Sequence, residues 1–320
     1  MQTGNRVGAG RDCGASDTKR RVQCFYSPGY YVPLPEGHPF PIAKYPDSHR
    51  MLLVSPERDR MTFNLVQPAD MEDVLRIHTV EYLDAIRNDG LSDFARNRLG
   101  LPHHPRTLER NLLDVAGTIA ASEAALINGV AWNLGGGTHH AMPGEGLGFC
   151  VTNDVSVAVV RLKHRHPDLK ILVLDTDAHQ GNGNHRILRE QPGVFTYSIH
   201  VGANYPAVKE PGDMDVPLPR YVEAATYLHE LRESLERLTD LFSPDLVFWI
   251  SGADVHEDDR FGQMKLSLDA VAERDRMVIE TVGRMKAALV GTYGGGYNRD
   301  YPLTPRLHSD SVRASLMLLK

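Results

Sequence analysis

The sequence predicts an α/β protein of three layers, in which a mainly parallel β-sheet is flanked by helices. Two observations lead to this fold class. From about residue 110 onward, short apolar runs alternate with segments of helical periodicity, as expected of successive strand and helix units. Each apolar run is also followed by glycine and polar residues, which are typical of loops that leave the end of a strand.

The expected strands are five apolar runs, each short enough to cross a sheet once. They are residues 130–134, 171–174, 194–199, 246–250 and 287–290. Amphipathic stretches that predict helices lie before and between these runs. They are residues 69–88, 108–128, 154–165, 221–241 and 268–286. Because no repeat or linker divides residues 21–320, we expect a single domain there.

The first twenty residues, MQTGNRVGAGRDCGASDTKR, are polar and rich in glycine. They offer little apolar surface to bury, so we expect residues 1–20 to form a mobile tail. The GAG within this stretch follows no plausible strand, and it is therefore not interpreted as a dinucleotide-binding loop.

The composition is ordinary for a globular protein, with 320 residues of which 42% are hydrophobic and 24% charged. The 35 Lys and Arg residues are scattered among 41 Asp and Glu residues, for a net charge of -6, so we expect no nucleic-acid partner. No apolar stretch is long enough to span a membrane. Cys13, Cys24 and Cys150 form no CxxC pair, which favours a reducing compartment, and we expect a cytoplasmic protein.

The segments that follow the expected strands carry many functional groups. In chain order they read GGGTHH, DTDAH, HVGANYP, SGADVHEDD and GTYGGGY. In an open α/β sheet the ligand crevice lies outside the carboxyl ends of the strands, so segments far apart in the sequence converge there. Their order along the chain predicts an active site at this edge of the sheet.

Asp177 and His179 stand two positions apart directly after an expected strand, so both side chains can point the same way. A carboxylate buried at a strand end requires a cation, a proton or a partner. Asp254 follows another expected strand and completes a set of three ligands. Three protein ligands with a fourth position for water are typical of a catalytic zinc, although the same set can hold iron.

His139 and His140 follow three glycines, and two adjacent imidazoles could share acid and base work on a water and on a leaving amine. The other histidine pair, His103–His104, lies in a proline-flanked loop, where we expect a solvated role. Tyr297 follows three further glycines. Its hydroxyl could donate to a carbonyl oxygen as charge develops there, or the ring could simply pack after a turn.

Together, LGGGTHH, GFC, DTDAHQGNG, SGAD and GGGY make the chain resemble the zinc-dependent histone deacetylase family, which has an arginase-like α/β fold. The motifs are collinear with the family over residues 24–300 or so. FYSPGY, HPF at 38–40 and DAHQGNG are most similar to class IV deacetylases. Class I and II members generally carry a second histidine where Gln180 stands and an aspartate where Asn182 stands.

The resemblance implies a role for each candidate residue. Asp177, His179 and Asp254 would bind Zn²⁺, and Tyr297 would polarise the acyl carbonyl. His140 would be the general base and acid.

Further roles follow from the same resemblance. His139 would be the electrostatic companion of His140, oriented by Asp175. The amide oxygen of Asn182 can accept an imidazole N–H and fix the tautomer of His140, but it cannot compensate an imidazolium as a carboxylate would. We therefore predict a lower pKa for His140 than in a carboxylate-paired site. The residues that line the substrate channel would be Gly148, Phe149 and Gly295. A potassium ion would lie near Asp175, Asp177, His179 and Ser198.

The predicted function is a zinc-dependent hydrolase that removes acyl groups from lysine side chains of proteins or peptides by metal-activated water. The acyl group would be acetyl or, by class IV resemblance, a long fatty chain. One alternative is an acetylpolyamine amidohydrolase that acts on a small acylated amine, which acidic residues near the entrance (Glu257, Asp258 and Asp259) could favour. A catalytically silent acyl-lysine reader is a second alternative. An arginase-type enzyme is disfavoured, because His256 stands where a second bridging aspartate is expected. The sequence does not predict the oligomeric state.

Overall fold

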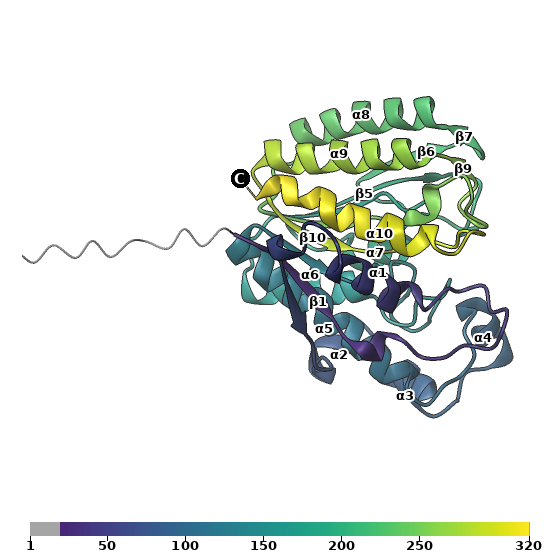
Figure 1. Cartoon of the computed structure of the whole chain (residues 1–320). Coiled ribbons are helices and arrows are strands. Elements are labelled where there is room, and N and C mark those ends of the chain that lie inside the picture. Colours follow the sequence, from purple (N-terminus) through teal and green to yellow (C-terminus); the bar gives the residue numbers. More distant parts are fainter. Residues whose placement is uncertain (1–19, 320) are drawn as a thin grey trace, which may run out of the picture.

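An eight-stranded sheet forms the middle layer of the computed structural model, which describes residues 20–319 (Figure 1). All neighbouring strands in it are parallel, in the order β2-β1-β3-β10-β8-β4-β5-β6. The strands are β1 (Val22–Tyr26), β2 (Met61–Leu65), β3 (Val130–Asn133), β4 (Ile171–Asp175), β5 (Val194–Val201), β6 (Met214–Leu218), β8 (Leu246–Ile250) and β10 (Ala288–Thr292). Two short strands, β7 (Val222–Glu223) and β9 (Met264–Lys265), pair separately.

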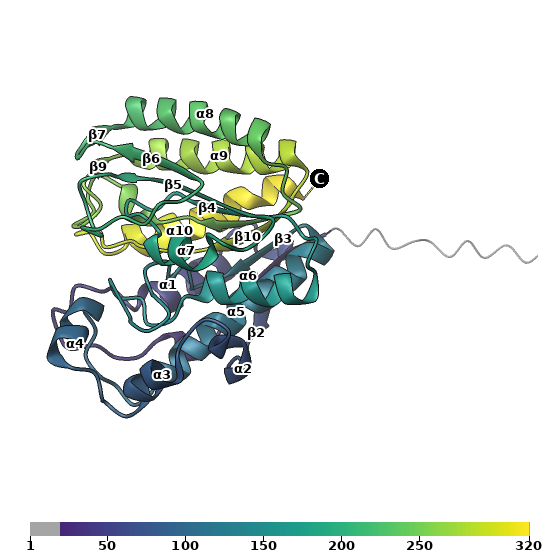
Figure 2. The same ribbon diagram turned by 180° about the vertical axis from the view of Figure 1, so that it is seen from behind.

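Helices cover both faces of this sheet (Figures 1 and 2). They are α1 (Lys44–Leu53), α2 (Met71–Leu75), α3 (Val80–Arg87), α4 (Asp93–Leu99), α5 (Thr107–Asn128), α6 (Asp154–Arg165), α7 (Asn182–Leu188), α8 (Ala224–Leu241), α9 (Leu268–Met285) and α10 (Leu303–Ala314). α5 and α6 pack together on one face, whereas α8, α9 and α10 lie over the other, with α1 against α10. The predicted three-layer α/β fold is confirmed. Within the described residues, no helix combines the length and the apolar character needed to cross a membrane.

Side chains of the central strands alternate between two cores, because successive residues of a strand point to opposite faces. In β4, Leu172 and Leu174 join the core beneath α8, α9 and α10. Ile171 and Val173 join the core beneath α5 and α6. Since both faces are buried, such a strand is a continuous apolar run, and all five runs predicted as strands are strands.

The helix predicted over residues 69–88 is wrong as a single element. α2 ends at Leu75 and α3 begins at Val80, because the residues between them make contacts that a continuous helix would prevent. The Thr79 hydroxyl caps α3 by accepting from the backbone N–H of Tyr82 at 3.3 Å. The Nε2 atom of His78 accepts from the backbone N–H of Asn153 at 2.9 Å, which ties this break to the start of α6.

Most of the predicted tail, residues 1–20, lies outside the described residues, and the single domain predicted over 21–320 stays a prediction. Strands β1, β2 and β6 and helices α1, α4, α7 and α10 were not predicted.

Candidate active site

Four loops meet at the carboxyl ends of the adjacent strands β3, β10, β8 and β4. The ends of three of these strands are level, since Ile250 in β8 is in register with Asp175 in β4 and with Thr292 in β10. The loops that follow therefore start side by side, as predicted from the order of the motifs along the chain.

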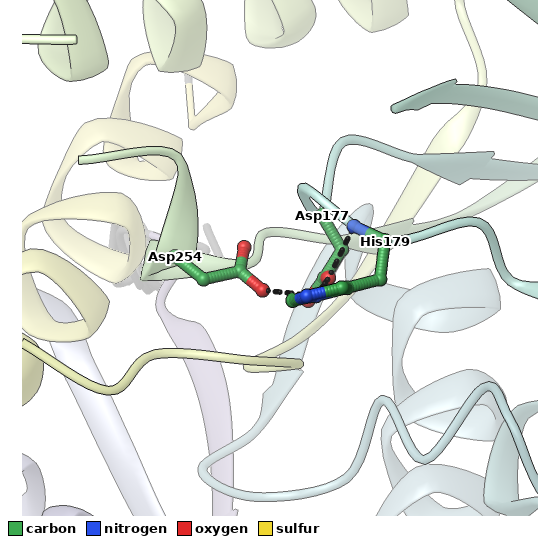
Figure 3. A group of neighbouring side chains, drawn as sticks. All are labelled: Asp177, His179 and Asp254. Atoms are coloured by element: carbon green, nitrogen blue, oxygen red, sulfur yellow. Dashed lines mark hydrogen bonds and ion pairs between the residues drawn. The ribbon is translucent and has the colours of Figure 1, made fainter. Parts of the chain in front are cut away.

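Asp177, His179 and Asp254 are brought together by the loops after β4 and β8 (Figure 3). All three are buried, and one ligand atom from each lies within 4.8 Å of the other two. His179 Nδ1 lies 2.8 Å from Asp254 Oδ2 and 3.1 Å from Asp177 Oδ1. Backbone N–H groups hold both carboxylates, because Asp254 Oδ1 accepts from Ala178 at 2.9 Å and Asp177 Oδ2 accepts from Gly295 at 2.6 Å.

This donor set fits a single divalent metal ion. Burial and the neighbouring Asp177 carboxylate raise the pKa of Asp254 to about 7, because two buried carboxylates that share one site repel each other. Two carboxylates and one imidazole, with room for a fourth ligand, match a catalytic zinc better than a closed structural one.

The two predicted histidines lie beside the candidate metal ligands, and each is oriented by a different partner. His139 Nδ1 donates to Asp175 Oδ2 at 2.7 Å, and His140 Nδ1 lies 2.7 Å from Asn182 Oδ1. The ring centroids are 4.1 Å apart. Burial would lower the pKa of His139, but the Asp175 and Asp177 carboxylates raise it to about 9. Burial, assisted by the neighbouring His139, keeps the pKa of His140 well below its usual value.

The glycines before the histidine pair allow two loops to approach closely. Gly137 has a φ of +73°, and a Cβ there would lie 2.5 Å from the backbone nitrogen of Gly294 in the loop after β10. The buried Asp154 carboxylate fixes this conformation, because it accepts from the backbone N–H groups of Gly137 at 3.1 Å and Thr138 at 2.8 Å. A larger side chain at Gly137 would therefore separate the loops that carry the histidines and Tyr297.

Tyr297 is buried at the floor of the site, and Asp259 holds its backbone. The Asp259 carboxylate accepts from the N–H of Tyr297 at 2.5 Å, of Phe261 at 2.8 Å and of Gly262 at 2.9 Å. Asp259 is only 6% exposed, so it faces inward. It was expected near the entrance, and that expectation is wrong.

A pocket of about 300 Å³ leads from the surface to these residues. It is lined by Asn97, Arg98, Leu99, Gly100, His140, Gly148, Phe149, His179, Asn204, Tyr205, Arg260, Phe261, Gln263 and Tyr297. Gly148 and Phe149 line this pocket. Together with Gly295 they also line a smaller inner cavity of about 20 Å³. Glu257 and Asp258 line neither space, and His103 and His104 also lie elsewhere. Ser198 is buried, with its hydroxyl 3.0 Å from His200 Nδ1.

Lys44 is a buried residue at this site that the sequence did not reveal. Its Nζ donates to the main-chain oxygen of Gly294 at 2.8 Å. It also lies 5.4–5.6 Å from the ring centroids of Phe40, Tyr45 and Tyr297. Burial lowers the pKa of Lys44 to about 8 although nearby carboxylates oppose the change. No local pattern distinguishes this lysine from a surface lysine.

Arg274 on α9 is a second buried residue that was not predicted. It donates to main-chain oxygens of Thr176, Ser251 and Gly252 at 3.5, 3.2 and 2.6 Å. Its guanidinium also pairs with Asp275 at 2.7 Å. These carbonyls belong to the loops that carry Asp177 and Asp254, so the guanidinium of Arg274 holds both loops. A charged residue in the apolar stripe of an amphipathic helix is the signal that could have found it.

Comparison with known proteins agrees with this geometry. The family model described as the histone deacetylase domain matches residues 38–305. An uncharacterized protein of Picosynechococcus sp. is 36% identical over 281 residues, which cover 86% of this chain and 92% of that protein. Histone deacetylase 2 of Arabidopsis thaliana is 26% identical over 306 residues, which cover 91% of this chain and 78% of that protein. The crystal structure of a histone deacetylase homologue from Aquifex aeolicus has the same fold, with a TM-score of 0.77, 23% identity and coverage of 92% of this chain and 84% of that one. The chain therefore belongs to the histone deacetylase family and is an amidohydrolase.

Proposed function

We propose that this protein removes short acyl groups from lysine side chains or from similar acylated amines, with a metal ion bound by Asp177, His179 and Asp254. The observation that carries the proposal is the meeting of this ligand set with His140 and Tyr297 at the floor of one pocket. A Zn²⁺ ion held there would act as a Lewis acid on the acyl carbonyl and lower the pKa of a water molecule.

His140 is suited to move the proton during the reaction. The amide oxygen of Asn182 only accepts hydrogen bonds, so His140 Nδ1 carries its proton and Nε2 has a free lone pair. Nε2 can therefore take a proton from the attacking water and later give it to the leaving amine. Because the pKa of His140 is low, its imidazole is neutral at physiological pH and can accept a proton.

Tyr297 and His139 stabilise charge in this scheme. The Tyr297 hydroxyl donates to the carbonyl oxygen as negative charge develops there. Burial raises the pKa of this phenol well above its usual value. The hydroxyl therefore stays protonated and can donate a hydrogen bond. His139, whose pKa is raised by the Asp175 carboxylate, supplies positive charge beside the reacting water.

The inner cavity supports a short acyl group. The amine portion of the substrate extends toward the mouth of the pocket, so the acyl tail must lie on the inner side. A volume of about 20 Å³ there holds about one water molecule, which favours acetyl over the long fatty chains implied by class IV resemblance. Among residues 20–319, no acidic side chain lines the pocket, so this lining does not favour an acetylpolyamine.

The proposal includes a K⁺ ion near the main chain of Asp175, Asp177 and His179 and near Ser198, as the family resemblance implies. The pairing of Asp175 with Ser198 in adjacent strands is consistent with it. We also propose a reducing, cytoplasmic location, since Cys24 and Cys150 are both free and buried.

The test is turnover of one lysine peptide that bears an acetyl, octanoyl or myristoyl group, before and after treatment with a chelator. We expect acetyl to be removed fastest, and activity to be lost on chelation and in Tyr297→Phe. Tyr301→Phe is the matched control, because the Tyr301 hydroxyl bonds to Asp47 outside the pocket. Metal-loaded protein that binds the acetylated peptide without hydrolysing it would instead identify a silent reader.

A further inference from the structure

Two arginines stand out among the described residues that line the pocket. Among the fourteen residues that line it, Arg98 and Arg260 are the charged ones apart from the site histidines, and there is no aspartate or glutamate. Both arginines are exposed. An amine substrate must therefore pass two guanidinium groups, and these attract anions.

Arg98 lies in the last turn of α4, where its backbone also supports the channel. Its main-chain oxygen accepts from the N–H of Gly148 at 3.1 Å. Its guanidinium pairs with Glu145 at 2.5 Å, and both side chains are about 40% exposed (42% and 38%). Burial raises the pKa of the pocket residue Tyr205 to about 12, while the nearby Arg98 charge opposes that rise. The charge of Arg98 thus reaches the pocket, although Glu145 compensates it in part.

Arg260 lies in the sequence between two residues of the site. Its neighbours are Asp259, whose carboxylate is used by three backbone N–H groups, and Phe261. Within residues 20–319, the Arg260 guanidinium has no ion pair or hydrogen bond. Its charge is therefore available to a ligand.

A neutral acceptor accompanies these charges. Gln263 also lines the pocket, and its buried Oε1 atom has no hydrogen-bond donor among the described residues. Leaving a buried acceptor unpaired is costly.

We propose that Arg98 and Arg260 select substrates whose amine portion carries a carboxylate close to the acylated side chain. The inference deepens the proposed deacylase function and rests on it. The inner cavity is too small for a charged acyl tail, so the carboxylate belongs to the amine side. It can come from the α-carboxylate of an acyl-lysine amino acid or from acidic side chains that flank an acyl-lysine in a peptide.

The test compares steady-state hydrolysis of two small substrates that differ by one charge. These are Nα-formyl-Nε-acetyl-lysine as the free carboxylate and as the carboxamide. We expect kcat/KM to be about tenfold higher for the carboxylate, since charge-assisted hydrogen bonds to arginine are strong. The difference should lie in KM, because the arginines contact a part of the substrate that does not react. Two doubly capped peptides, with acidic or basic residues around acetyl-lysine, form the second arm.

The variants Arg98→Gln and Arg260→Gln should each reduce the preference, and the double variant should abolish it. Arg237→Gln, an exposed arginine on α8 that lines no part of the pocket, is the control and should keep it. If only the small acid is preferred, the arginines recognise the α-carboxylate of the amino acid. If only the acidic peptide is preferred, they recognise the side chains that flank the acyl-lysine. Equal kcat/KM for both members of each pair, or a preference unchanged in the double variant, would overturn this proposal alone. Absence of turnover on every substrate would overturn the proposed function as well.

Discussion

Replacing Arg274 should weaken the fold and the proposed metal site by different amounts, and a second substitution can separate the two effects. In Arg274→Met, Asp275 is left as a buried carboxylate whose remaining side-chain partner is the Ser311 hydroxyl at 2.6 Å. Removing one member of a buried ion pair costs about 3–5 kcal/mol. For a chain of 320 residues, this corresponds to a fall in melting temperature of about 5–7 °C.

The double variant Arg274→Met/Asp275→Leu removes both charges. Apolar replacement of a buried ion pair is often close to neutral for stability, so we expect most of the lost melting temperature to return. The loops that carry Asp177 and Asp254 would still lack the guanidinium that joins their main-chain oxygens. Metal affinity should therefore stay about 10–100-fold below that of the wild type, as found when groups that orient metal ligands are removed.

The assay is titration of metal-free protein with Co²⁺, followed by visible absorption, together with thermal unfolding of the same samples. Arg313→Met is the control, because Arg313 pairs with Glu57 at the surface and such pairs contribute about 1 kcal/mol or less. If the double variant were stable and bound Co²⁺ within twofold of the wild type, Arg274 would have no part in holding the site.

Three further predictions concern the same site. In Asn182→Asp, the new carboxylate raises the pKa of His140, and since the base must be neutral, the acidic limb of the kcat/KM profile should move to higher pH by about 1 unit or more; an unmoved limb would contradict the role of Asn182. In Asp259→Asn, one carboxylate acceptor for the backbone of Tyr297 is replaced by an amide, so kcat should fall about tenfold with little change in KM, whereas Asp258→Asn should leave both near wild type. Removing the metal with a chelator should lower the melting temperature, since an ion that binds only the folded state stabilises it; an unchanged temperature would argue against a bound metal.

The central strands were predictable because burial on both faces makes them uninterrupted apolar runs. The outer strands β2 and β6 are half-exposed and contain polar residues, and β6 contains Pro217, which is tolerated at a sheet edge. Their sequences do not differ clearly from loops. The break between α2 and α3 escaped prediction because it depends on a distant contact, from His78 to the backbone of Asn153.

The candidate site was predictable where its residues follow strand ends. Asp177, His179, Asp254 and His140 stand at such ends, and the topology of a parallel sheet brings them together. Lys44 and Arg274 come from helices, and their contacts depend on how those helices pack on the sheet.

The inward direction of Asp259 was equally hidden. It stands in a run of three acidic residues, which has the pattern of a solvated surface. Its carboxylate is held instead by backbone N–H groups of two loops, an arrangement without a local sequence signal.

The order of the strands also constrains how the chain can fold during synthesis. β10 is the last strand to be made, yet it lies in the middle of the sheet, between β3 and β8. Until the ribosome has released residues 288–292, β3 and β8 each have an unpaired edge, and such edges promote association with other chains. Tyr297 follows β10, so the candidate active site can form only after this final insertion. A nascent chain stalled before β10 would be both inactive and the species most in need of a chaperone.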